Sequence, residues 1–129
     1  MIGYLMVGTN DLARSLSFYD AVFAPLGYQK VKTKERYVAY GNPETGGRSE
    51  FYVTGPFDKK PATAGNGTMV ALPVPTLQIL HDIYEIAGNS GGLQDGAPGP
   101  RVANSPTHYA YVRDPEGNKL AFYCDDPTA

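Results

Sequence analysis

The chain of 129 residues contains one cysteine, two histidines and no tryptophan. Because Cys124 has no second cysteine to pair with, no disulfide can form within the chain, which agrees with a reducing cytoplasm. The net charge is -2 and basic residues form no run, so nucleic acid and anionic membranes are not expected partners. No apolar stretch is long enough to span a bilayer, and the opening MIGYLMVGTNDL is too short for a signal peptide. We therefore expect a soluble, cytoplasmic protein.

What the chain does contain fits a single domain over residues 1–129. Hydrophobic residues make up 42% and charged residues 19%, which is an ordinary balance for a globular protein. A chain of this length can bury a substantial core. Ten residues are tyrosine, an unusual number beside the absence of tryptophan. Aromatic side chains of this kind are candidates for lining a binding site.

The first part of the chain, up to about residue 54, follows a β-α-β-β-β pattern. The predicted strands cover residues 2–8, 28–34, 36–40 and 49–53, and the predicted helix covers 12–23. Polar residues at 9–11 offer N-caps for this helix, and Pro25 and Gly27 end it. We expect this segment to form the first of two modules.

The same pattern begins again after residues 55–67, which lack periodicity and are predicted to form a linker. The second module, about residues 68–126, is predicted to have strands at 68–74, 107–113 and 119–124 and a helix from Leu77 to Ala87. Residues 95–106 are expected to form a long loop, and 114–118 a tight turn in which Gly117 has a positive φ.

The repeat is visible when the two modules are aligned. Laying YLMVGTNDL over MVALPVPTL pairs Tyr4 with Met69, and laying GGRSEFYV over GNKLAFYC pairs Glu50 with Ala121. Each module has one helix and an incomplete sheet, so the two must pack together to bury their apolar faces. The expected fold class is α+β, built from two tandem βαβββ modules.

Three segments carry a resemblance to a known family. The strand-turn-strand YAYVRDPEGNKLAFY resembles the C-terminal signature of the vicinal-oxygen-chelate superfamily, which comprises glyoxalases, bleomycin resistance proteins and dioxygenases. MVGTNDLARSLSFYDAVFAPLGY resembles its first strand and helix, and GGLQDGAPGPR resembles the connecting loop of its small bacterial glyoxalase-like members. The resemblance implies a cupped mixed sheet with helices on its outer face, and a homodimer. It implies no single activity, because the superfamily includes lyases, isomerases, dioxygenases and non-catalytic drug-binding proteins.

The resemblance also locates the position of the superfamily's divalent metal. In catalytic members four side chains, from the first and last strands of each module, bind the ion through imidazole, amide or carboxylate groups. The matching positions here are Tyr4, Glu50, Met69 and Ala121. Only Glu50 is an ordinary ligand, because a thioether and a methyl group do not hold Mg, Mn or Zn. We therefore expect no metal cofactor and, in its place, a small-molecule ligand.

Strand alternation predicts which side chains line the cup. If Tyr4 faces inward, the residues two positions along each strand do so as well, and His108 begins a strand near the expected mouth. The predicted ligand-binding residues are Tyr4, Met6, Arg48, Glu50, Tyr52, Met69, Ala71, His108, Ala121 and Tyr123. A surface of tyrosine, methionine and small residues around one carboxylate suits a flat, partly aromatic or cationic molecule.

Several alternatives remain at this point. Tyr4 and Met69 are also able to fill a collapsed cavity, and Glu50 to sit at a sheet edge or pair with Arg36 or Arg48. An enzyme of the lyase or dioxygenase type would use a displaced metal site made of Glu50, His108 and Tyr4. A third alternative is metal-free acid–base catalysis, with Glu50 as the catalytic residue assisted by Tyr4 or Tyr52.

Overall fold

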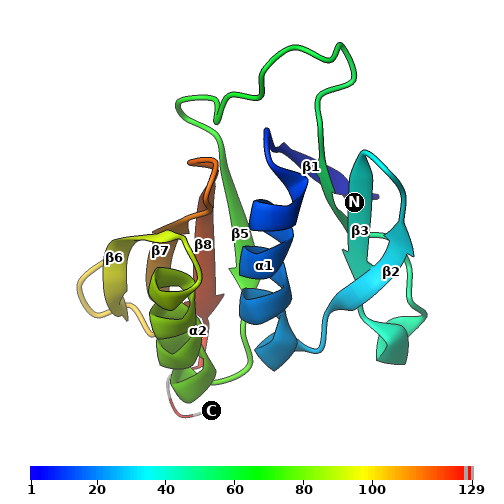
Figure 1. Ribbon diagram of the computed structural model, residues 1–129. Helices are drawn as coiled ribbons and strands as arrows, with labels where there is room; N and C mark the ends of the chain where they lie inside the picture. The colour runs from blue at the N-terminus through cyan, green and yellow to red at the C-terminus, as the bar shows by residue number, and fades with distance from the viewer. Residues whose placement is uncertain (127, 129) are drawn as a thin grey trace.

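The computed structural model describes residues 1–126 and 128, which form two modules of the same design (Figure 1). Module one contains β1 (Leu5–Gly8), α1 (Leu12–Phe23), a 3-10 turn (Ala24–Leu26), β2 (Gln29–Thr33), β3 (Tyr37–Gly41), a second 3-10 turn (Pro43–Thr45) and β4 (Phe51–Thr54). Module two contains β5 (Met69–Pro73), α2 (Leu77–Asn89), β6 (Leu93–Pro100), β7 (His108–Arg113) and β8 (Lys119–Cys124). In the part of the chain that is described, neither helix has the length and hydropathy of a membrane span.

Each module folds into one four-stranded mixed sheet with the same topology. The strand orders are β1-β4-β3-β2 and β5-β8-β7-β6. In both sheets the first and last strands of the module are parallel, and the other neighbours are antiparallel. The predicted α+β fold with two β-α-β-β-β modules is therefore confirmed.

One predicted loop and the starts of two predicted strands were wrong. β6 lies largely within residues 95–106, where a loop was expected. Its glycines and prolines are typical of loops, and its pairing with β7 shifts register twice, so the sequence has no regular strand pattern here. The first strand begins at Leu5 rather than at residue 2, and β4 begins at Phe51 rather than at 49. Tyr4 and Glu50 therefore lie just before their strands.

The helices begin where the sequence predicts. The Asp11 side chain accepts a hydrogen bond from the Arg14 amide at the start of α1, and Thr76 accepts one from the Ile79 amide at the start of α2. Gly27, with φ of 76°, takes the left-handed conformation that ends the first helical segment. These caps fix the start of each helix relative to the strand before it.

One hydrophobic core runs through both modules. Helix α1 contributes Phe18, Tyr19, Val22 and Phe23, which are all fully buried. The fit against module two is tight, because a β-carbon added at Gly92 would lie 2.5 Å from the Phe18 ring and 2.7 Å from the Arg113 carbonyl. Only glycine leaves room for α1 at this point.

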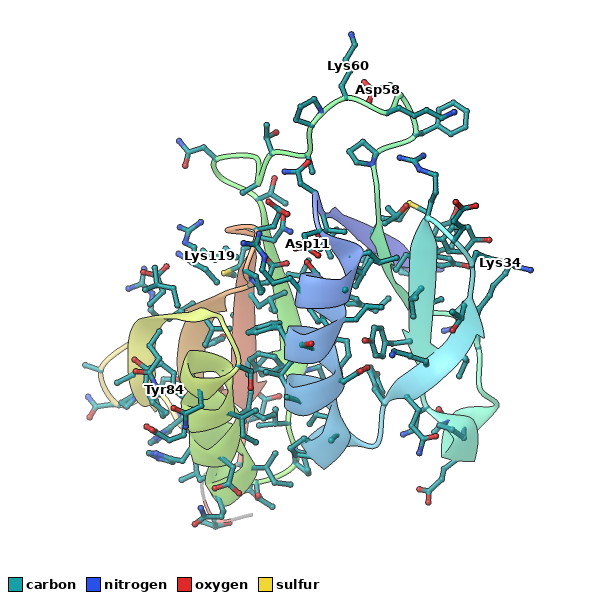
Figure 2. All side chains as sticks on the ribbon, viewed as in Figure 1. Asp11, Lys34, Asp58, Lys60, Tyr84 and Lys119 are labelled. Atoms are coloured by element: carbon teal, nitrogen blue, oxygen red, sulfur yellow. The ribbon has the colours of Figure 1, made fainter. Side chains whose placement is uncertain are left out.

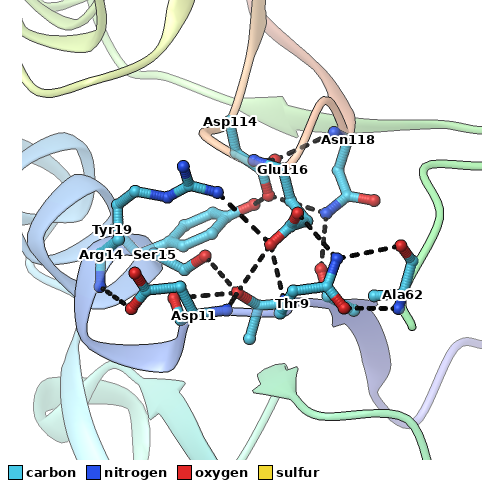
Figure 3. Close-up of polar contacts among 11 residues, drawn as sticks. Thr9, Asp11, Arg14, Ser15, Tyr19, Ala62, Asp114, Glu116 and Asn118 are labelled. Carbon is cyan, nitrogen blue, oxygen red and sulfur yellow. Dashed lines mark hydrogen bonds and ion pairs between the residues drawn. The ribbon is translucent and has the colours of Figure 1, made fainter. Parts of the chain in front are cut away.

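A buried polar cluster, which we call the joint, connects the turn after β7 to module one (Figure 3). The Tyr19 hydroxyl on α1 donates to Asp114 Oδ2 at 2.6 Å. Asn118 Nδ2 donates to the same oxygen at 2.8 Å and to the Gly8 carbonyl of β1 at 3.0 Å. Burial, and then the Asp114 carboxylate, raise the pKa of Tyr19 well above its ordinary value, so the phenol stays protonated as a donor.

The joint continues through Glu116, on the same turn. Its Oε1 accepts from the Asn10 amide at 2.6 Å, and its Oε2 accepts from Asn10 Nδ2 at 3.0 Å. Arg14 lies 3.5 Å away as an ion-pair partner. The Asn10 amide, above all, lowers the pKa of Glu116. Asn10 also bonds to the backbone of Ala62, which attaches the linker to the joint.

Asn118→Ala should destabilise the fold by about 1–3 kcal/mol, because Gly8 and Asp114 then lose a buried hydrogen-bond donor. Urea denaturation followed by far-UV circular dichroism measures this difference. The exposed Asn66, changed to alanine, is the matched control and should alter stability by less than about 0.5 kcal/mol. Equal effects of the two substitutions would show that the joint contributes nothing particular.

Glu116→Gln should remove an acid-sensitive part of the stability. The folded-state pKa of Glu116 is lowered, so its stabilisation is complete above the unfolded-state pKa of about 4.3 and is lost as the pH falls through the folded-state pKa. The difference in unfolding free energy between wild type and variant should be largest near neutral pH and shrink in acid. A difference that stays constant from neutral pH into acid would contradict this assignment.

Candidate functional site

Side chains alternate across both sheets, which defines a helix-facing side and an opposite side that we call the cup face. In β4, Phe51 and Val53 are buried against the helices while Tyr52 points the other way. In β8, Leu120 and Phe122 are buried in the core between residues of the cup face. Leu5 and Val7 pack into the core, as strand alternation predicts for residues flanking Met6.

Three tyrosines gather on the cup face of module one. The ring of Tyr52 lies 5.2 Å from that of Tyr4 and 5.7 Å from that of Tyr37, measured between centroids. Tyr4 exposes 59% of its surface and Met69, on β5, exposes 45%. The alternative in which these two side chains fill a collapsed cavity is therefore wrong.

A cavity of about 600 Å³ lies beside this cluster. Its apolar walls come from Met6, Tyr37 and Phe57, and charged residues from 34 to 36 at the tip of the β2–β3 hairpin line it as well. Lys34 projects outward from this tip (Figure 2). Sequence reasoning missed Tyr37 and Phe57: no repeat alignment covered the hairpin, and Phe57 lies in a segment without periodicity.

Module two has its own tyrosine cluster on the cup face. The Tyr109 ring lies 5.8 Å from that of Tyr123 and 6.1 Å from the nearly parallel ring of Tyr111. Ala121 is fully buried, opposite Tyr111 on β7 and Ala71 on β5. A second cavity, of about 150 Å³, lies where Met6 of β1 approaches Lys119 and Val70 of module two.

Glu50 is held in an ion pair. Arg48 donates to its Oε1 at 3.2 Å, and the Glu50 side chain retains 33% of its exposure. Burial, and then the charge of Glu50, raise the pKa of Tyr28. The pairing with Arg48 was one of the alternatives for this residue. A buried, unpaired carboxylate, the arrangement expected of a general acid or base, is not what the structure contains.

In module two the strand register separates Met69 from Ala121, two of the four residues predicted at the metal position. Met69 lies opposite Lys119, and Ala121 lies opposite Ala71, two residues further along β5. The four side chains predicted from the resemblance to stand at a metal site, those of Tyr4, Glu50, Met69 and Ala121, offer a phenol, a carboxylate, a thioether and a methyl group. Among residues 1–126 and 128, no three His, Cys, Asp or Glu side chains gather as a metal site would require. This donor set does not fit a divalent ion.

His108 lies away from the other predicted ligand-binding residues. It pairs with Cys124, whose buried side chain belongs to the helix-facing core, and directly paired residues point to the same side of a sheet. Tyr109 and Tyr123, one residue away on each strand, form the pair on the cup face. The displaced site of Glu50, His108 and Tyr4 is therefore not assembled on one surface.

Comparison with solved structures gives close matches over nearly the whole chain. A glyoxalase/bleomycin resistance protein from Albidiferax ferrireducens T118 is 30% identical, with a TM-score of 0.83 over 95% of this chain and 96% of that one. A glyoxalase/bleomycin resistance protein/dioxygenase family enzyme from Burkholderia phytofirmans PsJN matches at 17% identity and a TM-score of 0.74, covering 96% of this chain and 98% of that one.

A glyoxalase-related enzyme from Fulvimarina pelagi is 18% identical with a TM-score of 0.74, covering 96% of this chain and 87% of its own. The last two likenesses show the shared fold. No family model matches the sequence, and no curated protein does.

Gly96→Ala should displace the Tyr111 ring from the cup face. Gly96 lies on β6 and pairs with Tyr111 of β7. A β-carbon added at Gly96 would lie 2.8 Å from Tyr111 Cδ2, which is too close for the ring to keep its position. We expect an altered near-UV circular dichroism signal from tyrosine and a moved ring in a crystal structure. Gly99→Ala, on the same strand with no neighbour within 4 Å, should change neither measurement.

Proposed function

Because the chain belongs to the glyoxalase/bleomycin resistance/dioxygenase superfamily, we propose that it binds a small, partly aromatic organic molecule on the cup face of module one. The cavity bounded by Met6, Tyr37 and Phe57 is the observation that carries this proposal. Its volume of about 600 Å³ lies within the range of ordinary small-molecule sites, about 300–1,000 Å³. Binding, rather than a metal-dependent reaction, is the role that its residues support.

The side chains around the cavity explain why an aromatic molecule should enter it. Met6 exposes 55% of its surface and Phe57 exposes 99%, so an entering ring removes apolar area from water on two sides. Tyr37, backed by Tyr52 and Tyr4, offers ring faces and edges for offset or edge-to-face packing, worth about 0.5–1.5 kcal/mol per pair. The flexible thioether of Met6 adapts to ligands of different outline.

We also propose that the protein forms a homodimer and works in the cytoplasm. Ile2, Tyr4 and Met6 are exposed along the start of the chain, and Met69 is exposed on β5. β1 and β5 each pair with one strand only, so an edge of each is free within the described chain. Apolar side chains on free edge strands are suited to contact with a second copy. The single, buried thiol of Cys124 agrees with a reducing compartment.

Neutral aromatic probes such as 2-naphthol should bind the full-length protein with a Kd below about 1 mM. Phe57→Ser and Tyr37→Leu should each weaken this binding by about tenfold or more, because each removes aromatic surface that lines the cavity. Isothermal titration calorimetry measures the affinity. Thermal denaturation should show that Phe57→Ser leaves stability unchanged, since the side chain is 99% exposed.

Val102→Ser is the matched control for that experiment, because Val102 is 65% exposed and lies outside the cavity lining. Its affinity for 2-naphthol should equal that of the wild type. If no aromatic probe binds, or if Val102→Ser weakens binding as much as Phe57→Ser, the proposed site is wrong.

A further inference from the structure

We infer that the molecule bound beside Tyr37 is an anion, an aromatic ring that carries a carboxylate, sulfonate or phosphate group. This inference rests on the binding function proposed above and concerns the charge of the ligand. Tyrosine-lined surfaces suit organic cations when the ring faces are free, because the attraction comes from the negative face of the ring. The state of those ring faces, and of the carboxylates near them, therefore decides the sign of the ligand.

Cations of the chain itself already lie over the tyrosine rings in both modules. Lys32 Nζ lies 5.8 Å from the centroid of Tyr37, the ring that lines the cavity. In module two, Lys119 Nζ lies 5.3 Å and Arg101 Cζ lies 6.0 Å from the centroid of Tyr111. A cationic ligand would meet like charges at these rings, and an anionic ligand would meet opposite ones.

Two carboxylates on or beside the strands of the cup face are already paired with cations of the chain. Glu50 is paired with Arg48 at 3.2 Å, and Asp95 is paired with Arg113 at 3.1 Å. These pairs leave the cup face with no uncompensated carboxylate among the positions predicted to bind ligand.

The cations near the cavity, in contrast, are in excess. Lys34 and Arg36 line it against one acid, Glu35, and Lys32 lies over its tyrosine. Lys119 approaches Met6 from module two, through the small cavity between β1 and β5. Within residues 1–126 and 128, neither Lys32 nor Lys119 has a carboxylate within 4.0 Å. The chain as a whole has a net charge of -2, so the positive potential is local to this face.

Three probes with one ring system and different charges test the inference: naphthalene-2-sulfonate, 2-naphthol and 2-naphthyltrimethylammonium. Calorimetric titration of the full-length protein should give the sulfonate an affinity at least about tenfold higher than that of the ammonium, with the naphthol between them. Lys32→Gln and Lys119→Gln should each reduce this ratio by about threefold, with little change in the affinity for naphthol.

Lys60→Gln is the matched control, because it removes the same charge from an exposed position on the linker (Figure 2). Its sulfonate-to-ammonium ratio should equal that of the wild type. If the ammonium binds as tightly as the sulfonate, or if Lys60→Gln changes the ratio as much as the cup-face variants, the anion preference is wrong while the binding function stands. If none of the three probes binds, both proposals are wrong.

Discussion

The contact on which the rest of the architecture depends is the joint between the turn at 114–118 and the start of module one. Each module presents an apolar face that it cannot cover alone, but burying those faces does not by itself fix one orientation. The shared acceptor Asp114, reached from α1 by Tyr19 and linked through Asn118 to the end of β1, supplies the directional contacts. Hydrogen bonds of this kind, buried among aromatic side chains, tolerate few alternative packings.

Because the joint orients the modules by their helix-facing sides, everything polar or aromatic on the opposite sides becomes available for binding. Successive side chains along each strand point alternately to the core and to the cup face. Phe51 and Phe122 build the core, while their neighbours Tyr52 and Tyr123 are left on the cup face. The same register leaves Ala121 covered and Glu50 within reach of Arg48, so the cup face presents aromatic and cationic side chains.

Much of this arrangement was predictable from the sequence, since it follows from local rules. The repeat, the two capped helices, the strand faces and the Gly117 turn, whose φ is 93°, each depend on residues close together in the chain. What escaped prediction depends on pairing between distant segments. β6 carries little apolar alternation and is defined by its bonds to β7, and the offset between Met69 and Ala121 depends on which residues of β5 and β8 pair. His108 lies on the helix-facing side for the same reason, and Phe57 reaches the cavity from a segment that no periodic pattern describes.

The bonds between Asn10 and Ala62 have a consequence for the free energy of ligand capture. They tie the linker down partway along its length, so the segment with Phe57 is a short loop whose two ends, Thr54 and Ala62, are both anchored. A loop closed in this way has lost much of its conformational entropy before any ligand arrives. Ordering Phe57 over a bound ring then costs less than it would in a freely moving linker. The joint that orients the modules thus also pre-organises the aromatic wall of the cavity.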